Sequence, residues 1–190
     1  YGNVLARRSS GAIDYAMFAA LARRAPTVLN LGNHEPEFHD VAETVRRIAA
    51  TGVTVVSNLR DRTTGAPFAL AATHLKLGAR EAVVVGLSTD NLATFRVAIR
   101  PALDLANPVV WAKQHLSGLL AIAPIKIVLS HAGVRQDRDI LPLVPDGTLF
   151  AGAHDHLRFV HNEGATAYVH SGSWNDCFTL ARLRRDARGM

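Results

Sequence analysis

Short apolar segments alternate along the chain with longer segments in which apolar and polar positions repeat at helical spacing. This alternation predicts an α/β layered fold, because strands and helices must bury one face against each other. Neither an internal repeat nor a linker interrupts the pattern, so a single domain over residues 1–190 is expected. The apolar segments predict strands at 27–31, 53–56, 68–75, 82–87, 126–129, 148–151, 158–161, 167–169 and 178–183.

Helices are predicted where apolar side chains recur every three or four residues. Residues 12–24 form one such segment, and a second begins at Pro108 and runs to Leu120. The segment at 88–107, directly before the helix that begins at Pro108, is expected to be loop with a short helix. In the first helix we expect one apolar face to be buried, and this face consists of Ile13, Met17, Ala20 and Leu21.

The segment that begins after Asp40 carries the clearest local helix signals. Asp40 can cap the N-terminus, and Glu43 three residues later completes a capping box. Glu43 and Arg47 are spaced as a favourable surface ion pair, and Gly52 ends the helix because glycine tolerates positive φ. The expected buried stripe consists of Val41, Val45, Ile48 and Ala49.

The charge of the chain is basic but dispersed. Its net charge of +5 comes mainly from arginine, and the arginine pairs are spread along the sequence. A nucleic-acid binder would gather them on one element with aromatic residues, so that class is disfavoured; small anionic substrates are favoured through electrostatic steering.

No apolar run reaches the roughly 20 residues that a membrane span needs. The single cysteine, Cys177, excludes a disulfide within the chain.

Three polar segments, each centred on histidine, directly follow predicted strands at 31–35, 129–133 and 152–156. Open α/β sheets place their binding residues in loops at the carboxyl ends of strands. A single histidine there is most often a surface or turn residue. The pair His154 and His156 indicates more, because alternate residues of an extended segment point the same way or towards two neighbouring metals. We assign surface or turn positions to His39, His74, His115, His161 and His170.

Taken together, these segments resemble the third, fourth and fifth motifs of calcineurin-like metallophosphoesterases. They read Gly-Asn-His-Glu at 32–35, Ser-His-Ala-Gly at 130–133 and Gly-Ala-His-Asp-His at 152–156, in the same order and with matching spacing. The flanking segments resemble the branch that contains 5'-nucleotidases and 2',3'-cyclic phosphodiesterases. The resemblance implies a layered fold of two mixed β-sheets packed together and flanked by helices.

The resemblance also implies roles for the matching positions. Asn33, His131 and His154 would bind one metal ion, and His156 would bind another. His34 would act as general acid on the leaving oxygen, and Glu37, three positions later, would orient it. The implied activity is the hydrolysis of small phosphate esters, nucleotides among them, by attack of a metal-bound hydroxide. Relatives in the nucleotidase branch are commonly exported, which favours an exported or periplasmic location.

Two divalent ions explain why such residues are needed. A phosphate ester repels hydroxide, and a pair of ions roughly 3.5–4 Å apart both activates water and neutralises phosphoryl charge. Ligands that mix imidazole and oxygen suit Mn, Fe, Co or Zn better than Ca, and the sequence does not choose among them.

The chain departs from the family in two motifs. Asp-x-His and Gly-Asp, which begin members of the family, are not present, and residues 1–4 resemble the segment directly after Gly-Asp in those members; we therefore expect the domain to be N-terminally incomplete. The remaining predicted ligands are all neutral, so they would hold one ion weakly and be nearly inactive. The alternative is a catalytically inactive, anion-binding module of the same fold that lacks the first metal site.

Overall fold

The computed structural model describes residues 11–173 and 177–183, and it confirms the predicted layered α/β fold. A six-stranded mixed sheet forms the centre, with four parallel strands in the middle and one antiparallel strand at each edge. Its strands, in spatial order, are β4 (Ala72–Leu77), β5 (Arg80–Ser88), β7 (Ile125–His131), β8 (Leu149–Gly152), β10 (Thr166–Ser171) and β9 (Arg158–Glu163).

Two smaller sheets accompany the central one in the described residues. Strands β1 (Val28–Asn30) and β2 (Thr54–Val56) pair in parallel, and β3 (Arg60–Asp61) pairs antiparallel with β6 (Leu103–Asp104). The parallel strands β1, β7 and β8 each end directly before or within one of the three polar segments. The fold therefore presents those segments from strand ends, as predicted.

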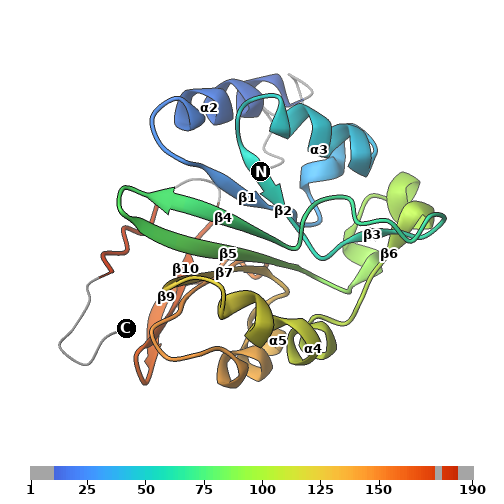
Figure 1. The fold of residues 1–190 in the computed structure, drawn as a ribbon. Coiled ribbons are helices and arrows are strands. Elements are labelled where there is room, and N and C mark those ends of the chain that lie inside the picture. The colour runs from blue at the N-terminus through green and yellow to red at the C-terminus, as the bar shows by residue number, and fades with distance from the viewer. Residues whose placement is uncertain (1–10, 174–176, 184–190) are drawn as a thin grey trace.

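Helices cover the strands on two sides. Figure 1 shows α2 (Ala12–Ala22) and α3 (Val41–Ala49) above the strands, with α4 (Pro108–Leu120) and α5 (Val134–Ile140) below them. The cap on α3 is as predicted, because the Asp40 side chain accepts a hydrogen bond from the Glu43 amide at 2.7 Å. Short 3₁₀ turns are η1 (Glu35–Glu37), η2 (Leu92–Thr94), η3 (Val97–Ala102) and η4 (Leu141–Leu143).

Over residues 11–173 and 177–183, the core consists of two hydrophobic clusters, one on each side of the strands. The first joins α4 and α5 to the central sheet and includes Leu116, Phe150 and Tyr168. The second joins α2 and α3 to the β1–β2 pair and includes Phe18, Leu31 and Ile48. In the described residues no helix is both long enough and apolar enough to cross a membrane.

The predicted buried face of α2 is wrong. Ile13, Met17 and Leu21 are 52%, 39% and 47% exposed, whereas Phe18 and Asp14 point inward. The helix is apolar almost all round, so periodicity alone does not select a face, and packing against the second cluster selects the one with Phe18. In α3 the stripe is correct for Val41 and Ile48, but Thr44 is buried in place of Ala49.

Two predicted strands and one helix also differ. The expected strand at 68–75 begins only at Ala72. Before it the chain forms isolated bridges instead, from Leu70 to Val56 at the end of β2 and from Pro67 to Arg60 at the start of β3. The expected strand at 178–183 is not one: no described strand pairs with it, and Phe178 and Leu180 are exposed. Helix α5 was not predicted, since its seven residues are too short for a clear period.

Candidate functional site

The three polar segments meet at one cavity. It has a volume of about 350 Å³ and is lined by side chains at the ends of strands β1, β7 and β8. Four of the five charged or imidazole side chains in its wall are histidines that the sequence singles out. These lining residues are His34, His131, His154 and His156, together with Glu35.

A direct contact joins the first segment to the second. Nε2 of His131 lies 2.7 Å from Oδ1 of Asn33. Asn33 is buried, and its amide nitrogen donates to the Thr94 carbonyl at 3.0 Å, so its oxygen faces the imidazole. The Asn33 oxygen is thus held beside a histidine that lies on a different sheet.

Close packing at Gly32 brings these two groups together. A Cβ atom at this position would lie 2.6 Å from Cε1 of His131, so only glycine leaves room for the ring. The Gly32 amide donates to the Glu35 carboxylate at 2.6 Å, which fixes the loop that carries Asn33. Burial raises the pKa of the Glu35 carboxyl group, against the opposing effect of that hydrogen bond. Glu35 belongs to the Gly-Asn-His-Glu motif, but no role was predicted for it.

The second and third segments meet through two imidazole rings. The His131 and His154 rings lie edge to face with their centroids 5.0 Å apart. Burial, together with the nearby His154, His34 and His156, lowers the pKa of His131 to about 3. Burial likewise lowers the pKa of His154, although Asp155 opposes this effect. Both rings are therefore neutral near pH 7 and can offer a nitrogen lone pair.

The backbone of the third segment is unusual. His154 and His156 have φ values of 83° and 57°, and both are left-handed conformations that a side chain disfavours. The segment is therefore not extended, contrary to the expectation from its sequence, although both side chains still line the same cavity. Between them, the Asp155 carboxylate accepts a hydrogen bond from the Val134 amide and so ties this turn to α5.

His34 lines the cavity, and Glu37 is its neighbour on the η1 turn. Nδ1 of His34 lies 3.9 Å from Oε2 of Glu37, which is within ion-pair range but longer than a hydrogen bond. The His34 side chain is 48% exposed, so it can meet a ligand from solvent. Arg96 donates to the Glu37 carbonyl at 2.7 Å and thereby holds the turn that carries both residues.

The donor atoms suit a transition metal in their chemistry, because such ions accept imidazole nitrogen and oxygen ligands. The 2.7 Å between Nε2 of His131 and Oδ1 of Asn33 is the length of a hydrogen bond, so the two groups contact each other directly. Within the described residues, however, no three His, Cys, Asp or Glu side chains surround one point as a ready ligand set. The ligand roles of Asn33, His131, His154 and His156 therefore stay predictions.

A buried polar network behind the two histidine loops was missed. It comprises Ser130, Asp137, Tyr168 and His170, and His170 is only 2% exposed rather than at the surface as predicted. The available signal was the spacing of Tyr168 and His170, which puts both on one face of a strand. Its other half lies on α5, whose position only the folded chain reveals.

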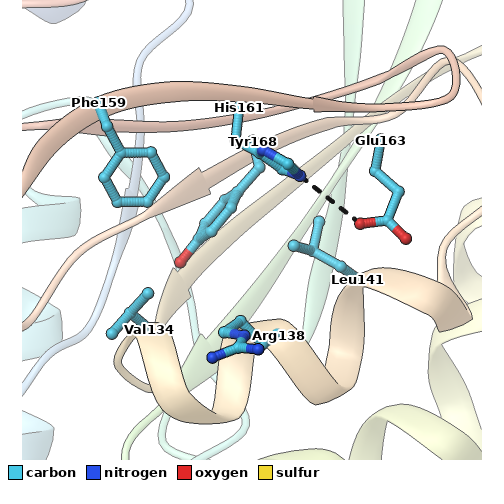
Figure 2. Close-up of a pocket in the computed structure, with 7 residues that line it drawn as sticks. All are labelled: Val134, Arg138, Leu141, Phe159, His161, Glu163 and Tyr168. Carbon is cyan, nitrogen blue, oxygen red and sulfur yellow. Dashed lines mark ion pairs between the residues drawn. The ribbon is translucent and has the colours of Figure 1, made fainter.

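A second and larger cavity, of about 510 Å³, lies between α5 and the β9–β10 hairpin. Figure 2 shows Tyr168 between strand and helix, with Phe159 beside it and Arg138 on the helix below. His161 and Glu163 form an ion pair of 3.7 Å at its rim, and His161 is exposed as predicted. None of the predicted site residues lines this cavity.

No protein-family model and no curated protein matches the chain. Solved structures do match. A candidate 5'-nucleotidase from Staphylococcus aureus superposes with a TM-score of 0.66 and 17% identity, over 89% of this chain and 36% of that one. The calcineurin-like phosphoesterase YfkN from Bacillus subtilis gives 0.63 and 15%, over 87% and 60%. A 5'-nucleotidase precursor from Thermus thermophilus gives 0.56 and 21%, over 85% and 37%.

These likenesses establish that the chain has the calcineurin-like phosphoesterase fold, as the motifs predicted. The chain spans little more than a third of the length of the two nucleotidase chains.

Proposed function

We propose that this chain carries part of the site of a metal-dependent hydrolase of phosphate esters, with nucleotides among its substrates. The observation that supports this most is the meeting of Asn33, His131 and His154, which come from three strand ends. An amide oxygen and two neutral imidazoles are ligands that transition metals accept. The fold that the chain shares with phosphoesterases adds to this support.

In this proposal Asn33, His131 and His154 bind one ion, and His156 binds a second. Divalent ions such as Mn, Fe, Co or Zn would activate water and neutralise phosphoryl charge there. His34 donates a proton to the leaving oxygen, since it is exposed and lines the cavity. Glu37 orients the His34 ring in this proposal, which the 3.9 Å between its carboxylate and Nδ1 of His34 supports.

The charges of the wall limit how much metal it holds. The four proposed ligands are neutral, and the two nearby carboxylates, of Glu35 and Asp155, already accept hydrogen bonds from the backbone amides of Gly32 and Val134. Two divalent ions in a partly desolvated site need more negative charge than this set supplies. We therefore expect the described residues to bind one ion more tightly than a second.

Cobalt(II) titration followed by absorption spectroscopy tests the proposed ligands. The protein is expected to bind Co²⁺, and His131→Ala and His154→Ala are each expected to weaken binding at least about tenfold, because each removes a nitrogen ligand. His115→Ala is the matched control, since His115 lies on α4 beside Trp111 and away from the cavity. Unchanged Co²⁺ binding in both site variants would refute the ligand assignment.

Hydrolysis of p-nitrophenyl phosphate and its bis ester tests the reaction separately. His34→Ala is expected to lower turnover by about 10²–10⁴-fold while Co²⁺ binding persists. Full turnover in this variant would remove His34 from the reaction.

The second candidate is a non-catalytic anion-binding module of the same fold. The neutral set of proposed ligands favours it, because two divalent ions bound to such a set would lack compensating negative charge. Calorimetry with inorganic phosphate and Co²⁺ would separate the two functions. Phosphate binding without any hydrolysis, under conditions where metal is bound, would support the module over the enzyme.

A further inference from the structure

A fully buried carboxylate lies behind the loops that carry His131 and His154. Asp137, on α5, has no exposed surface. Its Oδ1 accepts a hydrogen bond from the Ser130 hydroxyl at 2.5 Å, and its Oδ2 accepts one from the Tyr168 hydroxyl at 2.9 Å. Nε2 of His170 lies 2.9 Å from the same Tyr168 oxygen and 3.6 Å from Asp137. Four buried polar side chains therefore converge from β7, α5 and β10.

Asp137 controls the loop of His131 through Ser130. Ser130 immediately precedes His131 at the end of β7. Its hydroxyl oxygen, while donating to Asp137, accepts a hydrogen bond from the Ala132 amide at 3.2 Å. The residues on both sides of His131 are thus attached to Asp137, which restricts the direction in which the imidazole leaves the strand.

The same carboxylate also sets the position of the His154 loop. Gly152 ends β8 two residues before His154. A Cβ atom at Gly152 would lie 2.7 Å from Oδ2 of Asp137 and closer still to Nε2 of His170. The backbone of β8 therefore rests directly on the network, and any shift of Asp137 or His170 would move the start of the His154 loop.

Stability alone does not explain this arrangement. A buried carboxylate costs free energy that hydrogen bonds only partly offset, and apolar replacements of buried polar groups are often as stable. The network instead lies where the two histidine loops leave neighbouring strands. Residues behind metal ligands commonly orient them, and their loss lowers metal affinity by about 10–100-fold.

We propose that Asp137 is a positioning residue that, through Ser130 and Gly152, sets the separation between the His131 and His154 rings. The consequence for metal binding rests on the proposed function, whereas the positioning itself does not. Ser130→Ala removes the bond to Asp137 and the acceptor for Ala132 while changing little volume. Asp137→Asn keeps the shape of the side chain and removes its charge.

The matched control is Thr148→Val. Thr148 is buried directly before β8, at the opposite end from the His154 loop, and its hydroxyl donates to the Pro145 carbonyl at 2.6 Å. This variant also loses one buried hydrogen bond, so it should destabilise the fold by a similar amount. It should leave the separation of the two rings unchanged.

Two measurements test the proposal. In the metal-free protein, the nuclear Overhauser effect between the His131 and His154 ring protons should weaken in Ser130→Ala and in Asp137→Asn, but not in Thr148→Val. Co²⁺ affinity should fall about 10–100-fold in the first two variants and stay unchanged in the control. Should Asp137→Asn fail to fold, Ser130→Ala alone decides both measurements.

Unchanged ring contacts in folded Ser130→Ala would overturn the proposal, as would an equal loss in Thr148→Val. If the unaltered protein binds no Co²⁺, the proposed function fails, and the ring contacts in the metal-free protein still decide the positioning role.

Discussion

His131 Nε2 lies 2.7 Å from Asn33 Oδ1, although 98 positions separate the two residues in the chain. The contact joins the end of β1 to the end of β7, which belong to different sheets. It places an amide oxygen and a neutral imidazole nitrogen side by side.

Substitutions at Asn33 should change metal affinity in opposite directions. Asn33→Ala removes the oxygen and is expected to weaken Co²⁺ binding at least about tenfold, whereas Asn33→Asp keeps an oxygen, adds a negative charge and should strengthen binding. Titration of each variant with Co²⁺ checks both expectations. Equal affinities in the alanine and aspartate variants would show that this side chain does not contact the ion.

Gly32→Ala should disturb the site through packing alone. The new methyl group would overlap the His131 ring, so we expect a loss of about 1–3 kcal/mol in the free energy of unfolding together with weaker Co²⁺ binding. Gly118→Ala is the control, because the added Cβ would meet no atom within 4 Å apart from its chain neighbours and the nearby backbone of α4. That variant should be more stable by about 0.5–1 kcal/mol. Urea unfolding of both proteins measures the contrast.

Glycine should be tolerated better than alanine at position 156. His156 has a φ of 57°, a conformation that costs an L-residue about 1 kcal/mol or more, and glycine avoids this cost. We expect His156→Gly to be at least as stable as His156→Ala. At His161, in β9, the order should reverse, because glycine weakens a strand. Unfolding midpoints of the four variants decide; the same order at both positions would contradict the left-handed backbone.

The Tyr168 hydroxyl should make stability fall at alkaline pH. Burial, together with nearby Asp137, raises the pKa of Tyr168 in the folded protein. The unfolded chain therefore ionises first, near pH ~10. The stability from this group is fully present below that pH and is lost as the pH rises towards the folded pKa.

At pH 8, Tyr168→Phe should be less stable by about 1–3 kcal/mol, since it leaves a buried Asp137 oxygen without its donor. The gap to the unaltered protein should narrow above about pH 10. Tyr15, whose pKa burial also raises, is present in both proteins and cancels in the difference. Urea unfolding at several pH values measures the gap; a gap that stays constant up to about pH 11.5 would be inconsistent with the raised pKa.

The buried face of α2 can be tested with two neighbouring residues. Phe18→Ala should lower the free energy of unfolding by about 3–5 kcal/mol, because Phe18 lies in the second core cluster. Met17→Ala removes an exposed side chain and should change it by less than about 0.5 kcal/mol. The reverse order in urea unfolding would return the helix to the face that its periodicity predicted.

Much of the fold follows from local pattern. The cap at Asp40, the bounds of α4 and the places of most strands depend on atoms a few residues apart, and the structure agrees with each. The motifs also identified the fold and named four histidines and an asparagine that the chain brings to one region. Their metal and catalytic roles stay predictions.

Other features depend on contacts between distant segments, and local pattern carries no information about them. The face that α2 buries is one, because its apolar residues surround the helix and only the partner elements choose among them. The strand expected at 178–183 is another, since a strand exists only where a second strand pairs with it. Residue types and their spacing thus set which helices and strands form and which side chains are candidates for chemistry. Long-range packing sets which of them meet, as it does for Asn33 with His131 and for Asp137 with Tyr168 and His170, because those distances depend on how whole elements stack.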